Sequence, residues 1–383
     1  MKFEIENHVL KKCIAEPDET IAIVPDTVIS IDFSAFAGCK SLQEIYLPNS
    51  VTSIGYSSFI GCKSLKKIHL PNSITSIGDF TFVSCKSLQE IHLPDSVTSI
   101  GGMVFHKCQS LQKIYLPDSM ISIGQEAFRF CESLQEIHLS NHITSIKPGT
   151  FHGCKSLQEI HLPNCIVSIG DFSFASCKSL RKIYLPDSVT SIGNWGFSKC
   201  ESLQEVHLPN HITSIGSNAF AACKSLQEMH LPDSMISIED GIFSDCESLQ
   251  EIYLPDSITS IGANAFENCK SLREIHFPKN LVTIDGGAFC NCEALEKIYL
   301  PNNLTSIGCN AFSECKSLRE VYLPNSVIRI ENEAFFNCVS LEKIRFPKGI
   351  ADIGLRAFCN CSSLDKKYFP DSITDIDYIT STE

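Results

Sequence analysis

The feature that most constrains this chain is a 23-residue repeat that runs almost from end to end. Each repeat contains a phenylalanine followed three positions later by a cysteine, and 15 such pairs occur without a slip in spacing, from Cys39 to Cys361. One unit this short cannot bury an apolar face alone, so successive units must stack on one another. The sequence therefore predicts one elongated solenoid in place of the two or three globular domains expected from 383 residues.

Three regions follow from the extent of the repeat. Residues 1–24 do not fit it, and their alternating apolar pattern, interrupted at Asn7, predicts an N-terminal β-hairpin cap. Residues 25–369 hold the repeats. Residues 370–383 resemble half a repeat, which predicts a C-terminal cap with an acidic tail. Caps are needed because an open solenoid end exposes apolar residues.

Within each repeat, one segment predicts a short strand. In residues 42–47 the side chains of Ile45 and Leu47 should point to the core, whereas Glu44 and Tyr46 should point outward. Pro48 should end the strand, because proline cannot donate to a β-ladder.

The rest of the repeat predicts a turn region. Gly55 suggests a turn with a relaxed backbone. Phe59 and Cys62 lie three positions apart, as on one face of a helical or 3₁₀ turn. We expect both side chains to be buried.

The charge and hydropathy of the chain disfavour some classes of protein. Forty-four acidic residues against 31 basic ones give a net charge of −13, which disfavours nucleic acid as a partner. No run of 18 apolar residues predicts a membrane span. The N-terminus lacks the apolar core of a secretory signal, so a cytoplasmic location is expected.

Twenty cysteines would indicate disulfides in a small secreted protein, but 15 of them occupy one repeat position. We expect these to be small buried hydrophobic residues in a reducing compartment. The others should be structural or neutral, since Cys-x-Cys pairs are only weak metal or redox motifs; they are Cys13, Cys165, Cys290, Cys309 and Cys359.

The repeat resembles the BspA-like, or Treponema pallidum-type, leucine-rich repeat family. The match rests on the pattern Leu-x-x-Ile-x-Leu-Pro-x-x-Val-Thr-x-Ile-Gly-x-x-Ala-Phe-x-x-Cys, seen clearly in residues 253–269. The resemblance implies an α/β repeat solenoid: a right-handed leucine-rich-repeat horseshoe or arc of about fifteen units. Its parallel β-sheet would line the concave face, with short, 3₁₀ or helical turns on the convex side. The resemblance also implies interaction or adhesion roles, a route to the cell surface, and no catalytic residues.

Two outward columns on the predicted strands are the candidate binding site. The first holds tyrosine and histidine at one position per repeat: Tyr46, His69, His92, Tyr115, His138, His161, Tyr184, His207, His230, Tyr253, His276 and Tyr299. The second holds mostly glutamate or lysine, and four glutamates are stacked in a row: Glu205, Glu228, Glu251 and Glu274. Tyrosine offers broad contact at low entropic cost, and the acidic stripe suits a basic or extended segment of a protein partner.

Other interpretations of these columns remain open. The order Tyr-His-His recurs every 69 residues through His230, so duplication of triplets also explains the regularity. Neighbouring histidines could bind a metal or respond to pH, although a flat sheet supplies only two ligand arms. A structural or variable surface protein without a single ligand is a further alternative.

The sequence holds no signature of catalysis. No repeat carries an insertion that could form an active-site loop, and no phosphate-binding or zinc-binding motif is present. We therefore expect a non-enzymatic, monomeric binding protein without a cofactor or metal.

Overall fold

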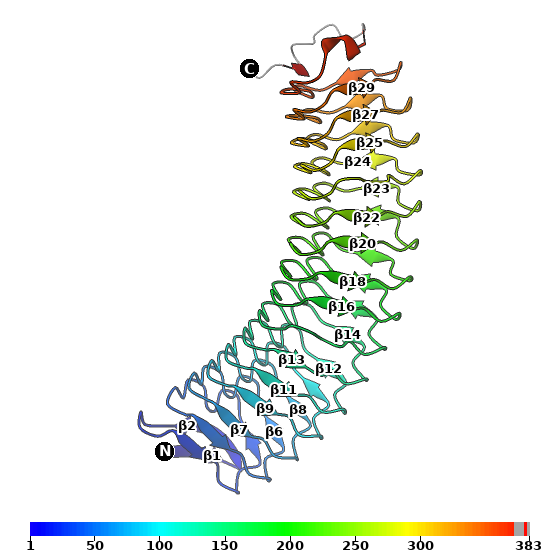
Figure 1. Ribbon diagram of the computed structural model, residues 1–383. Coiled ribbons are helices and arrows are strands. Elements are labelled where there is room, and N and C mark those ends of the chain that lie inside the picture. The colour runs from blue at the N-terminus through cyan, green and yellow to red at the C-terminus, as the bar shows by residue number, and fades with distance from the viewer. Residues whose placement is uncertain (371–378, 381–383) are drawn as a thin grey trace. The chain divides into compact units, whose positions relative to one another are not determined.

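The computed structural model describes residues 1–370 and 379–380 and consists of stacked coils, one for each repeat. The coils form two compact units, Met1–Val189 and Thr190–Glu383. Within each unit, equivalent residues of successive coils pair as parallel strands in identical register, as the constant period requires (Figure 1). The predicted solenoid of stacked parallel strands is confirmed.

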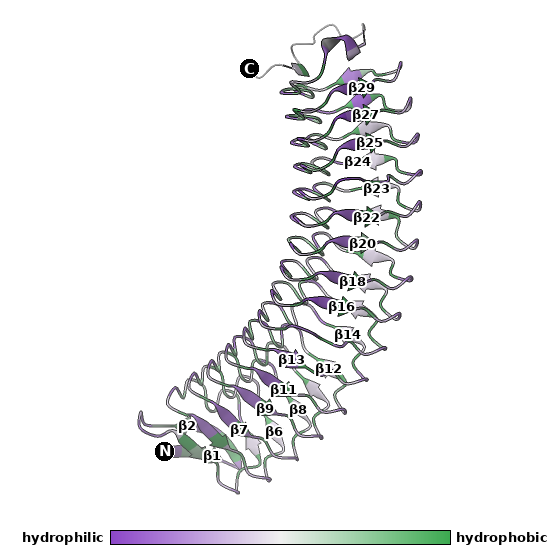
Figure 2. Cartoon of the chain, viewed as in Figure 1, coloured by the Kyte–Doolittle hydropathy of each residue, from purple (hydrophilic) through white to green (hydrophobic). Residues whose placement is uncertain are grey.

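One ladder, here called the Tyr/His ladder, is built from the predicted strand segment of each repeat. In the first unit its strands are β3 (Ile21–Ile23), β5 (Glu44–Tyr46), β7 (Lys67–His69), β9 (Glu90–His92), β11 (Lys113–Tyr115), β13 (Glu136–Ile137) and β16 (Lys182–Tyr184). In the second unit they are β18 (Glu205–His207), β20 (Glu228–His230), β22 (Glu251–Tyr253), β25 (Lys297–Tyr299), β27 (Glu320–Tyr322) and β29 (Lys343–Arg345). Most of these strands are purple in Figure 2, because two of their three residues are hydrophilic.

A second ladder of two-residue strands, here called the Ser-Ile ladder, follows the proline of each repeat. The first unit contains β4 (Ser30–Ile31), β6 (Ser53–Ile54), β8 (Ser76–Ile77), β10 (Ser99–Ile100), β12 (Ser122–Ile123), β14 (Ser145–Ile146) and β15 (Ser168–Ile169). The second contains β17 (Ser191–Ile192), β19 (Ser214–Ile215), β21 (Ser237–Ile238), β23 (Ser260–Ile261), β24 (Thr283–Ile284), β26 (Ser306–Ile307), β28 (Arg329–Ile330) and β30 (Asp352–Ile353). The isoleucine of each pair is buried, so this ladder contributes to the core.

The N-terminal segment forms a hairpin of β1 (Lys2–Glu6) and β2 (Val9–Ile14). Strand β2 also pairs in parallel with β4, and β3 pairs in parallel with β5. Coil-like stacking therefore already begins within residues 1–24. The hairpin extends the Ser-Ile ladder at its N-terminal end, in the strand order β1-β2-β4-β6, and Phe3 contacts the ring of Phe36 edge-on.

The core consists of ladders of identical side chains. Phenylalanine rings stack from coil to coil, for example Phe105 on Phe128 at 5.5 Å between ring centroids and Phe128 on Phe151 at 5.6 Å. Leucine, isoleucine and cysteine ladders fill the remaining space, and these side chains are almost fully buried. The Phe and Cys of each repeat thus lie on one buried side, as predicted.

The expected helical turn at Phe-x-x-Cys is wrong. The segment has no helix in any repeat that the structure describes; it is a turn, in which the cysteine amide donates to the carbonyl of the phenylalanine three residues earlier, as Cys62 does to Phe59. Every second amide donates to the next coil, as Ser57, Phe59 and Gly61 do to the carbonyls of the coil above. Donors used in this way cannot form the i→i−4 bonds of a helix. The α/β label is therefore wrong for this chain, whose described residues are strands and turns with one 3₁₀ turn, η1 (Lys366–Tyr368), and a helical fragment at 379–380.

The end of the array departs from the repeat. Lys367, in place of the usual inward isoleucine, is exposed and pairs with Asp365 at 2.8 Å. Ile379 is buried, and its carbonyl accepts a hydrogen bond from the amide of Phe358. The rest of the predicted C-terminal cap and tail (371–378 and 381–383) lies outside the described residues.

Candidate functional site

The predicted Tyr/His column lies on the surface of the Tyr/His ladder, together with the Glu/Lys column; this surface is here called the Tyr/His/Glu face. Between the two columns, the central residue of nearly every strand is buried and fixes the strand to the core. His69 is partly buried, and the other tyrosines and histidines of the predicted site are exposed; Tyr299, for example, is 58% exposed. Strand alternation thus places the two columns outward, as expected.

Aromatic rings of neighbouring coils stack face to face on this surface. Tyr46 lies parallel to His69 with ring centroids 4.2 Å apart, and His230 lies on Tyr253 at the same distance. The pairs His92–Tyr115 and Tyr299–Tyr322 are stacked in the same way, at 4.6 Å and 4.9 Å. Stacking holds the rings in one orientation before any partner arrives.

The Glu column is hydrogen-bonded to the aromatic column. His92 Nε2 lies 2.8 Å from Glu90 Oε1, in the same strand and two residues away. The hydroxyl of Tyr253 donates to Glu251 at 3.1 Å. Equivalent contacts join Glu136–His138, Glu159–His161, Glu205–His207, Glu274–His276 and Glu320–Tyr322, while Glu44 receives both Tyr46 and His69.

These bonds change the acidity of the groups involved. The His69 ring and then the Tyr46 hydroxyl stabilise the Glu44 carboxylate, which holds its pKa below the usual range. In the opposite sense, the hydrogen bond to Glu251 raises the pKa of Tyr253, and the bond to Glu320 raises that of Tyr322. These contacts therefore favour the ionised form of Glu44 and the neutral forms of Tyr253 and Tyr322.

The same contacts explain how four stacked glutamates are tolerated. Glu228 and Glu251 are register partners on β20 and β22, where like charges are unfavourable. Glu205 and Glu251 are each hydrogen-bonded to a ring two residues along the chain, and His276 Nε2 lies 3.6 Å from Glu274. The charge is thus partly compensated within each coil and leaves an acidic surface.

The Tyr/His ladder is interrupted wherever two histidines are neighbours. Strands β7 and β9, which carry His69 and His92, belong to separate sheets, and so do β18 and β20, which carry His207 and His230. Only a single bridge joins His138 to His161. The ladder is also interrupted away from the histidine pairs, because residues 274–276 lack a strand.

Two of these histidine junctions form shallow hollows. The first, of about 510 Å³, lies between β7 and β9 and is lined by Lys67, His69, Glu90 and His92 among others. The second, of about 270 Å³, lies 69 residues further on and is lined by Glu136, His138, Glu159 and His161 together with Gln135 and Gln158. The two hollows are equivalent positions of the larger period.

The described residues contain no group of three or more His, Cys, Asp or Glu side chains placed to hold a metal ion. No helix in the described part of the chain is long and apolar enough to cross a membrane. All 20 cysteines are free thiols.

Sequence reasoning found the two columns but missed the hydrogen bonds between them and the hollows. The signal for the first was Glu-x-His or Glu-x-Tyr in the same strand, which places both side chains on one face. The signal for the hollows was the pair of histidines in neighbouring repeats, which recurs every 69 residues.

Comparison with known proteins identifies the repeat. A sequence profile described as the BspA type leucine rich repeat region matches residues 4–132, 122–248, 196–299 and 282–380. The crystal structure of a leucine-rich repeat protein from Bacteroides ovatus is similar over 100% of this chain and 95% of its own, with 26% identity and a TM-score of 0.78. A leucine rich cell surface protein from Faecalibacterium prausnitzii is similar over 89% of this chain and 92% of its own, with 27% identity and a TM-score of 0.56. No curated protein sequence matches significantly.

Proposed function

Because this chain belongs to the BspA-type leucine-rich repeat family, we propose that it is a non-enzymatic scaffold that binds a protein through the Tyr/His/Glu face. The observation that carries the proposal is the exposed, stacked aromatic ladder whose rings are fixed by bonds to the glutamates of the same strands. Exposed tyrosines of this kind are enriched in recognition surfaces.

The fixed rings reduce the cost of binding. An exposed aromatic side chain that must be immobilised on binding loses about 0.5–1.5 kcal/mol of conformational free energy. In this protein, stacking on the next coil and the bond to glutamate already restrict rings such as Tyr253. A partner would therefore meet a preorganised surface.

The charge of the face indicates the partner's chemistry. The hollow at His138 and His161 is lined by two acidic side chains, Glu136 and Glu159. Lysine or arginine side chains of an extended segment would fit beside these carboxylates, with their apolar stems on the rings. Successive hollows would let one segment contact the face more than once.

The test is a selection from a library of extended peptides against the intact chain, followed by affinity measurements. We expect the selected peptides to be basic. Replacement of Tyr115, Tyr184 and Tyr253 by serine should weaken binding by about tenfold or more, because hot-spot aromatics each contribute at least about 2 kcal/mol.

A matched triple variant controls for general loss of exposed apolar area. Ile121, Val167 and Ile236 are exposed residues just before the Ser-Ile strands, outside the Tyr/His/Glu face. Their replacement by serine should leave peptide affinity unchanged. Equal losses in both triple variants, or selected peptides without basic residues, would refute the proposed face or the proposed partner chemistry.

A second candidate role is pH-dependent binding, favoured by the histidine–glutamate pairs of the face. Protonation of the imidazoles would add positive charge beside the carboxylates and weaken the binding of a basic partner. Affinity measured at about pH 7.5 and about pH 5.5 would test this role, since isolated histidines titrate near pH 6.5. An unchanged affinity would eliminate it.

A location on the cell surface, with a role in adhesion, is a further proposal supported by the cell surface protein from F. prausnitzii. Protease treatment of intact cells tests it, since a surface protein is cleaved and an internal one is not.

A further inference from the structure

On the turn side of the coils, the charge of the residue that follows the ladder cysteine changes along the chain. The residue after each ladder cysteine is Lys40, Lys63 and Lys86 in three consecutive coils. Further along, lysine and glutamate mostly alternate at the same position, as in Lys224, Glu247, Lys270, Glu293 and Lys316. Like charges in adjacent coils repel one another, so the three consecutive lysines call for an explanation.

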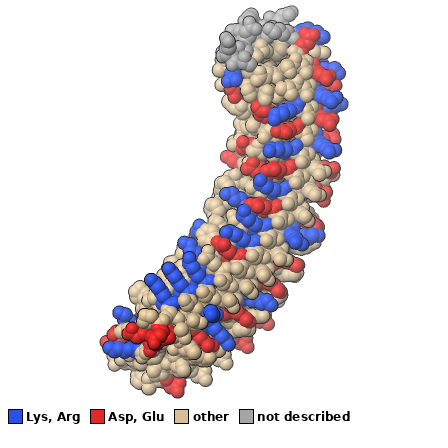
Figure 3. Space-filling model, turned by 60° about the vertical axis from the view of Figure 1, so that its left-hand side comes forward, with Lys and Arg blue, Asp and Glu red and all other residues tan. Residues whose placement is uncertain are grey.

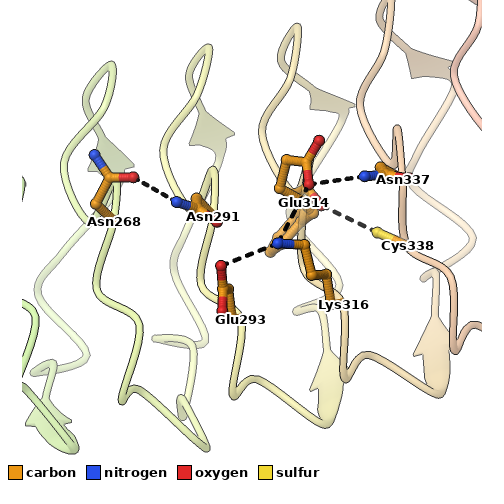
Figure 4. Close-up of polar contacts among 8 residues, drawn as sticks. Asn268, Asn291, Glu293, Glu314, Lys316, Asn337 and Cys338 are labelled. Atoms are coloured by element: carbon orange, nitrogen blue, oxygen red, sulfur yellow. Dashed lines mark hydrogen bonds and ion pairs between the residues drawn. The ribbon is translucent and has the colours of Figure 1, made fainter.

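In the second unit two of these lysines, Lys224 and Lys316, form ion pairs with glutamates. Lys316 Nζ lies 3.0 Å from Glu293 in the preceding coil and 3.8 Å from Glu314, two residues before it (Figure 4). Lys224 pairs in the same manner with Glu247 at 2.9 Å. The contact between Glu314 and Lys316 shows that the residues before and after the buried cysteine lie on the same side of the coil.

In the first three coils both kinds of neutralising partner are missing. The residues before the three cysteines are Gly38, Gly61 and Ser84 in place of an acid. Among residues 1–370, Lys40, Lys63 and Lys86 make no ion pair within 4.0 Å, and all three are exposed. On the face shown in Figure 3, basic side chains of the N-terminal unit lie in a row without acidic ones between them.

The surface beside the lysines is also open. A side chain added at Gly38 would meet no atom within 4 Å, and one added at Gly61 would meet only the backbone of Gly38. The two glycines form a bare strip of backbone next to the lysine row. Residues 36–113 contain seven lysines and four acids, although the chain as a whole has a net charge of −13. The basic row is therefore a local feature of the first coils.

We propose that this basic strip, formed by Lys40, Lys63 and Lys86 beside Gly38 and Gly61, binds a linear sulfated polysaccharide. Neighbouring coils are spaced as parallel strands, about 4.8 Å apart, so the ammonium groups form a line of closely spaced charges. Lysine binds sulfate esters as a point charge and needs no fixed bidentate geometry. The glycine strip lets a polymer chain approach the backbone.

The residues around the strip disfavour single-stranded nucleic acid, the other common linear polyanion. Segments 37–43, 60–66 and 83–89 contain no aromatic residue on which a base could stack. A serine follows each of the three lysines, and Gln43 and Gln89 lie three positions after Lys40 and Lys86; such side chains can hydrogen-bond to sugar hydroxyls.

The experiment measures binding of a heparin-derived octasaccharide to the intact chain by titration calorimetry. Replacement of Lys40, Lys63 and Lys86 by glutamine should weaken binding by about tenfold or more, and the wild-type affinity should fall by about tenfold between roughly 50 and 200 mM salt. The control replaces Lys224, Lys270 and Lys316, which have the same repeat position and the same charge, and should alter affinity by less than about threefold. Circular dichroism checks that both variants are folded.

Three outcomes would overturn the proposal. One is an equal loss of octasaccharide affinity in the two triple variants, which would mean that only net charge matters. Another is equal affinity for the desulfated octasaccharide or for a single-stranded oligonucleotide of the same charge. The last is no binding of the octasaccharide by the wild-type chain. The tyrosine-to-serine variant of the Tyr/His/Glu face should bind the octasaccharide normally, so this test stands apart from the proposed protein-binding function.

Discussion

At the residue scale, each coil turns through two residues with left-handed backbone. One precedes the ladder phenylalanine by two positions, as Ser57 does at φ 56°, and the other precedes the ladder cysteine, as Gly61 does at φ 73°. Few of these positions hold glycine, although glycine is the residue best suited to them. Gly55, where the sequence suggested a relaxed turn, does not have a positive φ; a side chain there would lie 2.8 Å from the Phe33 nitrogen.

The strain at these positions can be relieved by mutation. Ala222 has φ 58°, a conformation that costs an L-residue about 1–2 kcal/mol. Ala222→Gly should therefore raise the free energy of unfolding by about 0.5–1 kcal/mol, net of the added freedom of the unfolded chain. Ala221→Gly is the control. Ala221 is buried and has no positive φ, so its replacement should lower the free energy of unfolding by about 1 kcal/mol. Urea titration distinguishes the two; a destabilised Ala222→Gly would contradict the argument.

The hydrogen bonds of Glu44 predict a pH dependence. Its pKa is lowered in the folded protein, chiefly by His69, so the contact stabilises the fold above the unfolded pKa and the gain is lost as pH falls through the folded pKa. His69→Gln should move the Glu44 pKa up toward its usual value. NMR titration of the Glu44 carboxyl carbon measures this, and an unchanged pKa in the variant would show that His69 is not the cause.

At the element scale, the repeating unit is a coil whose polar groups are satisfied by its neighbours. Most ladder cysteines donate the thiol to the carbonyl of the phenylalanine 26 residues earlier, as Cys131 does to Phe105 at 3.1 Å; Cys39, in the first coil, donates to the carbonyl of Cys13. Cysteine is therefore more than a small apolar residue at this position. Cys165 replaces the usual serine of another ladder and contacts the carbonyl of Ile143 at 3.0 Å, which explains one cysteine outside the main column.

The phenylalanine ladder should carry much of the stability between coils. Phe128 is fully buried between Phe105 and Phe151, so Phe128→Ala should cost about 3–5 kcal/mol and increase hydrogen exchange in adjacent coils. Phe172, which is 42% exposed, is the matched control, and Phe172→Ala should cost less than about 1 kcal/mol. Comparable costs for the two variants would mean that stacking in the core is not the main contribution.

At the scale of the whole molecule, the fold depends on packing and hydrogen bonds and contains no covalent cross-link between coils. Its 20 thiols are free, and most are buried. Burial raises the pKa of ladder thiols such as Cys131, and it raises the pKa of Cys290 to about 11. A raised pKa keeps a thiol protonated and slow to react.

Thiol labelling tests this description of the whole chain. In the native state Cys309, the exposed cysteine, should react first, followed by the partly exposed Cys39, Cys165 and Cys290; in denaturant all 20 should react. Reductant should leave the circular dichroism spectrum unchanged. Rapid labelling of the ladder cysteines without denaturant, or loss of structure in reductant, would contradict the buried ladder.

The sequence by itself determined the period, the stacking of coils and the inward direction of Ile45, Phe59 and Cys62, because a constant spacing forces equivalent residues into register. It also placed Tyr115 and Glu90 on one exposed face, since strand side chains alternate. Only the tertiary structure decided that the Phe-x-x-Cys segment is a turn with one left-handed residue and not a helix. It also decided that glutamates such as Glu90 contact the ring of the same strand, and that the lysines at 40, 63 and 86 have no acidic partner among the described residues. These features depend on hydrogen bonds and charges between coils, whose partners lie about one repeat apart in the chain and are set by how the coils pack.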